Sequence, residues 1–185
     1  RTPAQIARAI RVGRQTPMSP GAWVFGPEFT AENLPRTAAI LHQATHQNRP
    51  LKEAAKVRIQ RPRPKRRDPA GTPCLKKHPT DSYPSGHSTG AALWSAFYAA
   101  AMPEYQPLFE NYVREAMWCR VLAGMHFPSD TQAGRLLGRL SAAEMLKNPA
   151  ARAAAAEIRA EILSFLKTRP ECAPAPSVPQ VPSLP

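Results

Sequence analysis

Apolar residues recur at helical spacing along most of the chain, whereas strict alternation of apolar and polar residues is scarce. This period is typical of amphipathic α-helices and argues against strands. The first stripe comprises Leu34, Ala38, Leu41 and Thr45. Pro35 lies near the start of that helix, and a second, short helix is expected over residues 51–59. It must end before the Arg61–Pro64 stretch, because a residue that precedes proline is disfavoured in the α region.

Later segments repeat the helical pattern. Helices are expected over residues 85–103, 104–124, 129–147 and 149–167. Ser85 and Ser129 are the N-cap candidates for two of them. A basic, extended segment over residues 61–67 continues into a loop that reaches about Tyr83. The pattern predicts an all-α fold, a compact bundle of about six helices.

The length of 185 residues fits one compact domain, which we place at residues 1–169. Six of the 22 prolines fall in residues 170–185, which predicts an extended or disordered tail. The longest nearly apolar run, residues 90–102, is too short to cross a bilayer. We therefore expect no transmembrane segment.

Basic residues dominate the charge. Lys and Arg number 25 against 13 Asp and Glu, a formal charge of +12. Such an excess favours an anionic partner such as a phosphate ester, a nucleic acid or an acidic membrane surface, although it can also serve solubility alone. The chain begins at Arg1 without a recognisable signal peptide, as a mature exported protein would.

One candidate site is the sequence Pro84-Ser85-Gly86-His87 at a predicted helix start. The first turn of a helix presents free N–H groups and the positive end of the dipole. Gly86 permits close approach of an anion, Ser85 adds a hydroxyl and His87 can deliver a proton. The alternative is a capped helix with a surface histidine, and this motif alone favours that alternative.

A second candidate combines Arg120, His126 and Asp130. Pro128 follows closely, so His126 is expected on a loop before the next helix. A carboxylate four residues away can bond one imidazole nitrogen and leave the other as a nucleophile. Arg120 offers a fork suited to phosphate oxygens. Taken singly, each residue is commonplace on a protein surface.

The third candidate is the basic run before the first of these motifs. Its cations are Arg61, Arg63, Lys65, Arg66 and Arg67. A solvated loop, or one that contacts nucleic acid, accounts for Lys65, Arg66 and Arg67, which we do not assign to the site. Lys56 and Arg63 stand apart because of the pattern that they complete.

Together, Lys56-x6-Arg63-Pro64, Pro84-Ser85-Gly86-His87 and Arg120-x5-His126-x3-Asp130 resemble the tripartite signature of the type 2 phosphatidic acid phosphatase (PAP2) superfamily. The superfamily includes bacterial class A non-specific acid phosphatases, lipid phosphatases and vanadium haloperoxidases. The likeness covers about residues 56–139, and the stretches Phe25-Gly26-Pro27 and Asn33-Leu34-Pro35 resemble the soluble acid phosphatases in particular. The resemblance implies an all-α bundle, in agreement with the periodicity.

The resemblance also implies roles for individual residues. His126 would attack phosphorus and form a phosphohistidine, Asp130 would orient it, and His87 would protonate the leaving alkoxide and later activate water. The groups that would hold the phosphate oxygens are Lys56, Arg63, Ser85, Gly86 and Arg120. Preorganised cations and N–H donors are what a transferring phosphoryl group needs, so no metal or other cofactor is expected.

The signature departs from the family at Cys119, where the family usually has serine before the arginine. We expect reduced rather than abolished activity from this change. Cys119 is either a buried helix residue or half of a disulfide with Cys74, and Cys172 in the tail is the expected free thiol or intermolecular partner. His42 and His46 have a metal-ligand spacing but no third ligand nearby, which favours a polar helix surface.

The expected function is therefore metal-independent hydrolysis of phosphate monoesters, either small esters or lipid phosphates reached from the aqueous side. A vanadium-dependent haloperoxidase is the alternative, with vanadate as cofactor instead of inhibitor, although such enzymes are generally much longer. A basic nucleic-acid-binding module is more remote, because it leaves the three motifs unexplained. The resemblance to acid phosphatases further implies a periplasmic or secreted protein and, by analogy, a homodimer. The basic loop suits peripheral contact with an anionic membrane.

Overall fold

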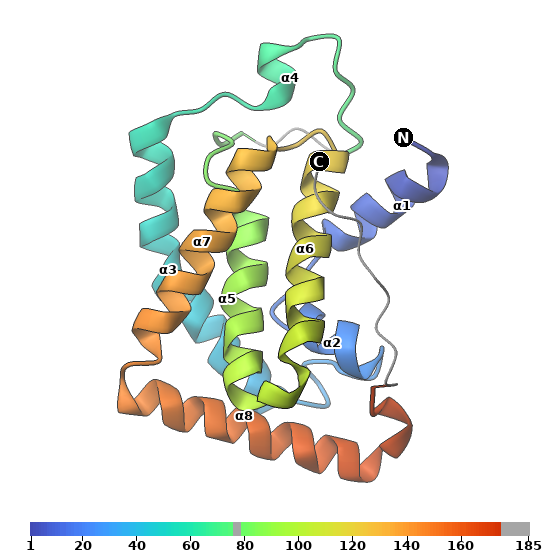
Figure 1. Ribbon diagram of the computed structural model, residues 1–185, viewed down its shortest axis with the longest axis vertical. Coiled ribbons are helices and arrows are strands. Elements are labelled where there is room, and N and C mark those ends of the chain that lie inside the picture. The colour runs from blue at the N-terminus through green and yellow to red at the C-terminus, as the bar shows by residue number, and fades with distance from the viewer. Residues whose placement is uncertain (76–78, 175–185) are drawn as a thin grey trace.

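A computed structural model describes residues 1–75 and 79–174, and within these ranges it is all-α, as the periodicity predicts (Figure 1). The α-helices are α1 (Pro3–Val12), α2 (Ser19–Phe25), α3 (Pro35–Ile59), α4 (Pro64–Arg67), α5 (Gly86–Ala101), α6 (Gln106–Leu122), α7 (Pro128–Met145) and α8 (Pro149–Thr168). The short 3₁₀ helices are η1 (Pro103–Tyr105) and η2 (Pro170–Cys172). No described helix is both long enough and apolar enough to span a membrane.

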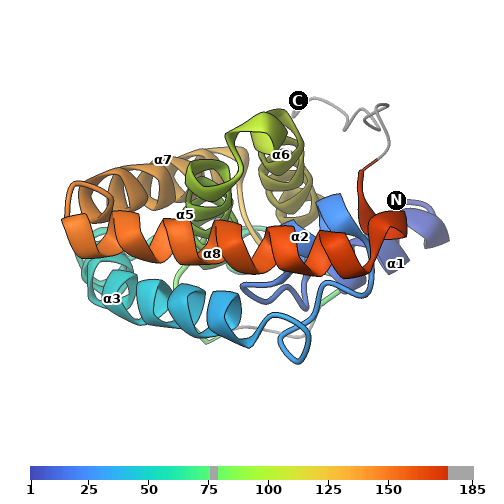
Figure 2. The same ribbon diagram turned by 90° about the horizontal axis from the view of Figure 1, so that it is seen from below.

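The core is organised around α5, which packs against α2, α3, α6, α7 and α8. Its sequence is apolar nearly all round, as a fully surrounded helix requires. Trp94, Phe97 and Tyr98 are buried in the core, as their helical spacing predicts. Figure 2 shows α8 crossing the ends of the other helices, where it closes the bundle.

Two glycines of α7 allow that helix to lie unusually close to α5. A Cβ atom at Gly134 would lie 2.4 Å from the carbonyl oxygen of Ser85, and one at Gly138 would lie 2.3 Å from that of Thr89. Both distances are far below van der Waals contact, so only glycine fits. Because the contacts advance in the same direction along both helices, α5 and α7 run parallel and their N-termini lie side by side (Figure 1).

The structure corrects the prediction of two helices between residues 34 and 59. α3 is one continuous helix of 25 residues with Pro50 inside it. Proline removes one backbone hydrogen bond, but packing of α3 against α5, α7 and α8 offsets that loss. α3 ends at Ile59, and its C-cap residue Gln60 adopts the left-handed conformation (φ 48°).

Other boundaries also differ from the sequence prediction. The segment Pro64–Arg67, expected to be extended, forms one short helix. α7 begins at Pro128 with Phe127 as its N-cap, two residues before the predicted cap at Ser129. No helix was predicted before residue 34, whereas the structure has α1 and α2 there. The capping box of α1, formed by Thr2 and Gln5, is the signal that identifies that helix.

The end of the described chain continues the fold beyond α8. Residues 170–172 form η2 and Cys172 is buried in the main core, whereas the sequence predicted an extended tail; the thiol of Cys172 is free, as expected. The preceding helix supplies the contact, because α8 packs against η2. The Pro-rich remainder, residues 175–185, lies outside the described residues, and the division at residue 169 stays a prediction.

Candidate active site

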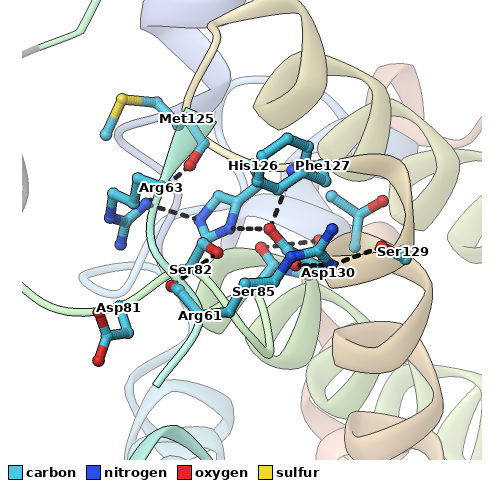
Figure 3. A network of polar contacts seen from close by, with 12 residues as sticks. Arg61, Arg63, Asp81, Ser82, Ser85, Met125, His126, Phe127, Ser129 and Asp130 are labelled. Atoms are coloured by element: carbon cyan, nitrogen blue, oxygen red, sulfur yellow. Dashed lines mark hydrogen bonds and ion pairs between the residues drawn. The ribbon is translucent and has the colours of Figure 1, made fainter. Parts of the chain in front are cut away.

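The N-termini of α5 and α7 bring two of the predicted motifs together. The backbone N–H of Ser85 donates to the carbonyl oxygen of Asp130 at 2.9 Å, which joins the two helix starts directly. His126 lies on the short loop before α7, as the sequence predicts. Residues 80–82 and Arg63 then cross this end of the bundle and complete the site (Figure 3).

His126 is held between a carboxylate and a guanidinium (Figure 3). Its Nδ1 faces Oδ2 of Asp130 at 3.5 Å, within ion-pair range but longer than a well-formed hydrogen bond. Its Nε2 lies 3.1 Å from Nη1 of Arg63. A guanidinium can only donate, so we assign the lone pair to Nε2 and the proton to Nδ1. This tautomer leaves Nε2 as the nucleophilic nitrogen.

The protonation state of His126 favours the same role. Burial lowers the pKa of His126 to about 4, with the charges of Arg63 and Arg120 acting in the same direction and Asp130 opposing them. The imidazole is therefore neutral at neutral pH. A neutral, oriented imidazole has its lone pair available for attack.

Asp130 is fully buried and held from three directions. Its Oδ2 accepts from the backbone N–H of Phe127 at 2.9 Å, and its Oδ1 accepts from Nη1 of Arg61 at 2.8 Å. Burial alone would raise the pKa of Asp130, but the close approach of His126, the hydrogen bond from Phe127 and the charge of Arg61 lower it below its usual value. Asp130 is therefore ionised and can stabilise a positive charge on His126.

Arg61 is a site residue that the sequence analysis did not assign. The same Nη1 also donates to Oγ of Ser129 at 2.7 Å, and the guanidinium lies 4.3 Å from the ring centroid of Phe127. Arg61 thus fixes the start of α7 and, with it, the position of Asp130. Nothing in the sequence distinguishes Arg61 from the other cations of the basic run. Further along the run, Nη1 of Arg66 lies 3.7 Å from Oδ1 of Asp81.

Lys56 and Arg63 are both buried and anchored to the loop that precedes α5. Nζ of Lys56 donates to the carbonyl oxygen of Asp81 at 2.6 Å, and Nε of Arg63 donates to that of Thr80 at 2.7 Å. Burial lowers the pKa of Lys56 to about 8, and the charge of Arg63 adds to that shift. Neither cation has a carboxylate partner of its own among the described residues.

Arg120 is the least satisfied group in the site. It is 3% exposed, and its Nε and Nη1 have no hydrogen-bond partner among the described residues. Burial lowers the pKa of Arg120 to about 10, and the charge of Arg63 contributes. A buried guanidinium without an acceptor is costly, so this position suits a bound anion.

These groups enclose a cavity of about 280 Å³. Its lining residues are Gln15, Lys52, Glu53, Lys56, Arg63, Thr80, Gly86, His87, Trp94, Arg120 and His126. Six of the eight predicted site residues line it. Asp130 lies behind His126, outside the lining. The hydroxyl of Ser85, predicted to contact phosphate, does not line the cavity; it accepts from N and Oγ of Ser88 and caps α5, and its role toward phosphate stays a prediction.

His87 is held by the segment between α1 and α2. Its Nε2 lies 3.1 Å from the carbonyl oxygen of Gly13, which can only accept, so Nε2 carries a proton. Nε2 of Gln15 donates to the backbone carbonyl of His87 at 2.7 Å, while Oε1 of Gln15 accepts from Tyr112 at 2.9 Å. Gln15 is thus a second site residue that was not predicted, because it belongs to no recognisable sequence motif.

Cys119 does not line the phosphate cavity. Its Sγ lies 3.4 Å from Oε1 of Glu115, and burial raises the pKa of the thiol to about 12. Cys74 and Cys172 are free as well. Cys119 is therefore a buried helix residue and is not in a disulfide with Cys74.

Two further features lie apart from the cavity. A larger cavity of about 790 Å³ adjoins the junction of α7 and α8, and it is lined by few charged groups. His42 and His46 are exposed on α3. The described residues contain no group of three or more His, Cys, Asp or Glu that could hold a metal ion.

The sequence profile of the PAP2 superfamily matches residues 37–153, which is more than half of the chain and includes every predicted site residue. Two kinds of curated relative are similar to parts of it. A lipid A 1-phosphatase of Rhizobium etli is 39% identical over 61 residues, which is 31% of this chain and 25% of the relative.

A non-specific acid phosphatase of Salmonella typhi is 33% identical over 81 residues, which is 44% of this chain and 32% of the relative. A second lipid A 1-phosphatase, from Rhizobium johnstonii, is also 39% identical over 61 residues. The matched segments therefore span about a third or less of these relatives.

Proposed function

Because the chain belongs to the PAP2 superfamily, we propose that it is a phosphatase that hydrolyses phosphate monoesters through a phosphohistidine at His126, without a metal ion. One observation carries the proposal. Three buried cations, Lys56, Arg63 and Arg120, surround the Nε2 face of a neutral His126, while the single carboxylate behind that histidine is already paired with Arg61.

The first step breaks the bond between phosphorus and the ester oxygen. A phosphate dianion enters the cavity, and its oxygens replace Nε2 of His126 as acceptors for Arg63. The freed Nε2 lone pair then attacks phosphorus in line with the leaving oxygen. Asp130 stabilises the positive imidazole that forms, and Lys56, Arg63 and Arg120 stabilise charge on the transferring group.

His87 supplies the proton that the leaving oxygen needs. The ring lines the cavity and acts in its imidazolium form: its Nε2–H exchanges the carbonyl of Gly13 for the ester oxygen, and the proton transfer leaves His87 neutral. Neutral His87 then accepts a proton from water, which attacks phosphorus and breaks the P–N bond. Orthophosphate leaves, and both histidines return to their starting states.

The proposed substrates are small phosphate esters or lipid phosphates presented to water, in line with the names of the relatives. The resemblance to acid phosphatases also supports a periplasmic or secreted location and a homodimer as proposals. Buried cations and a helix N-terminus serve here in place of a metal as the electrostatic stabiliser.

The test is hydrolysis of p-nitrophenyl phosphate from pH 4 to 8 in excess EDTA. Turnover is expected in EDTA and should fall by at least about 1,000-fold in His126→Ala, because the nucleophile is lost. Quenching in alkaline detergent during turnover should trap a phosphoprotein in the wild type alone, and the trapped phosphate should be stable in alkali and released by acid, as expected for phosphohistidine. Thermal unfolding of the variant controls for loss of fold. Turnover that EDTA abolishes, or that survives in a folded His126→Ala protein, would contradict the mechanism.

A further inference from the structure

A second cavity, of about 310 Å³, adjoins the phosphate cavity. Lys52, Gly86 and Trp94 line both of them, so the two share a wall. The other lining residues are His42, Thr45, His46, Asn48, Arg49, Thr89, Gly90 and Leu93. Among the described residues, none of those that line the second cavity is acidic. A ligand bound in one cavity can therefore extend into the other along α3 and the start of α5.

The outer wall of this second cavity is a row of hydrogen-bond donors on α3. His42, His46, Arg49 and Lys52 follow one another at helical spacing, so they share one face of the helix. Arg49 has no carboxylate partner among the described residues, whereas Lys52 is 3.3 Å from Glu53. A Cβ atom at Gly86 would lie 3.9 Å from Nζ of Lys52. The Lys52 ammonium thus stands at the boundary between the cavities.

The inner wall is formed by Trp94 and Asn48, and among the described residues it holds an unpaired donor. Trp94 lies at the junction, and its Nε1 donates to Oγ1 of Thr45 at 2.7 Å. A Cβ atom at Gly90 would lie 2.9 Å from the indole, so the ring packs directly on that glycine. Asn48 is 4% exposed, and its Nδ2 has no hydrogen-bond partner within the described chain. A buried amide donor of this kind is satisfied when an acceptor binds.

We propose that the second cavity is a subsite for a second anionic group on the leaving-group side of the substrate. The inference rests on the proposed phosphatase function and narrows its substrate class to phosphate esters with a further phosphate or carboxylate. Arg49 and His46 bind that group at the surface, and Lys52 links the two anions. A flexible chain of a few atoms between the anions lies against Trp94.

The probe is a series of α,ω-alkanediol bisphosphates of increasing chain length, each compared with the alkyl monophosphate of the same length. At low ionic strength, the best bisphosphate should have a KM about fivefold or more below that of its monophosphate. Two equivalent phosphates account for only about a twofold gain in kcat/KM. In Arg49→Gln/His46→Gln the advantage should fall to that statistical factor, with hydrolysis of the monophosphate unchanged.

Arg58→Gln is the matched control, because Arg58 is exposed on the same helix but does not line either cavity. It should keep the bisphosphate advantage. Added salt should weaken that advantage, since exposed charges are screened. A bisphosphate advantage limited to the statistical factor at every chain length, or one that survives in the double variant, would overturn the subsite.

Binding separates this inference from the proposed function. In His126→Ala, calorimetric titration with the same compounds measures affinity without turnover. The bisphosphate should again bind about fivefold more tightly than the monophosphate. If the wild type hydrolyses neither compound, the phosphatase proposal fails, and equal binding in the titration would overturn the subsite as well. If the wild type hydrolyses both equally and the titration shows equal affinity, only the subsite is overturned.

Discussion

Two buried clusters of charge meet along α6, and they are built in opposite ways. On one side, Arg8 of α1 donates Nε and Nη2 to the two carboxylate oxygens of Glu115 at 2.5 and 2.6 Å. Cys119 joins this pair through its thiol. On the other side, the next residue, Arg120, enters the phosphate cavity without a carboxylate partner among the described residues.

The difference lies in charge balance. Glu115 is fully buried, yet its charge is compensated by a fork-to-fork pair, which makes the cluster complete without a ligand. The phosphate cavity gathers Lys56, Arg63 and Arg120 around one neutral histidine. A complete cluster contributes to folding, whereas an excess of buried cations costs stability until an anion binds.

Replacement of Arg120 gives the largest expected effect. Arg120→Met should lower kcat/KM for p-nitrophenyl phosphate by about 100-fold or more, because a preorganised donor to the transition state is lost. The same change should raise the free energy of unfolding by about 1 kcal/mol, since it removes a buried charge that lacks a partner. Urea denaturation measures the second quantity.

Orthophosphate distinguishes the two effects in a single assay. It should raise the melting temperature of the wild type clearly and that of Arg120→Met only slightly. Arg58→Met, at an exposed position of α3, should change neither activity nor stability. An Arg120→Met protein that is much less stable and still fully active would contradict the distinction between the two clusters, because Arg120 would then serve folding and not phosphate binding.

Replacement of Glu115 should produce the converse result. Glu115→Gln leaves Arg8 without its counter-charge, and we expect the free energy of unfolding to fall by about 2–3 kcal/mol. This figure is below that of a fully buried pair, because Arg8 is one-third exposed and water compensates part of the loss. Where the variant is folded, kcat/KM should stay within about threefold of the wild type. Loss of turnover at unchanged stability would show that the clusters are not separate.

The smallest expected effect concerns pH. Since the pKa of Lys56 is lowered to about 8, its charge is present below that pH and lost above it. The profile of kcat/KM, which reports the free enzyme, should therefore fall above pH 8 and, on the acid side, near pH 4 as His126 becomes protonated. Lys56→Arg should extend the basic limb upward, because guanidinium keeps its proton. An unchanged basic limb would exclude Lys56 as its origin.

The local sequence determined most of the helices and the identity of the reacting groups. Apolar spacing predicted the helices from residue 85 onward, since each has a buried face. Spacing within the motifs placed His126 on a loop and His87 in a first turn. The prediction of two helices between residues 34 and 59 was wrong, because the packing that keeps α3 continuous through Pro50 comes from helices far along the chain.

Tertiary structure alone decided which of many cations face the cavity and which are neutralised. Arg61 and Arg63 are two residues apart, yet one holds Asp130 and the other faces Nε2 of His126. Likewise, Gly13 and Gln15 reach His87 only because α1 packs on α6. The sequence specifies residue types and local spacing, but charge compensation depends on distances of a few ångströms between segments, and folding alone sets those distances.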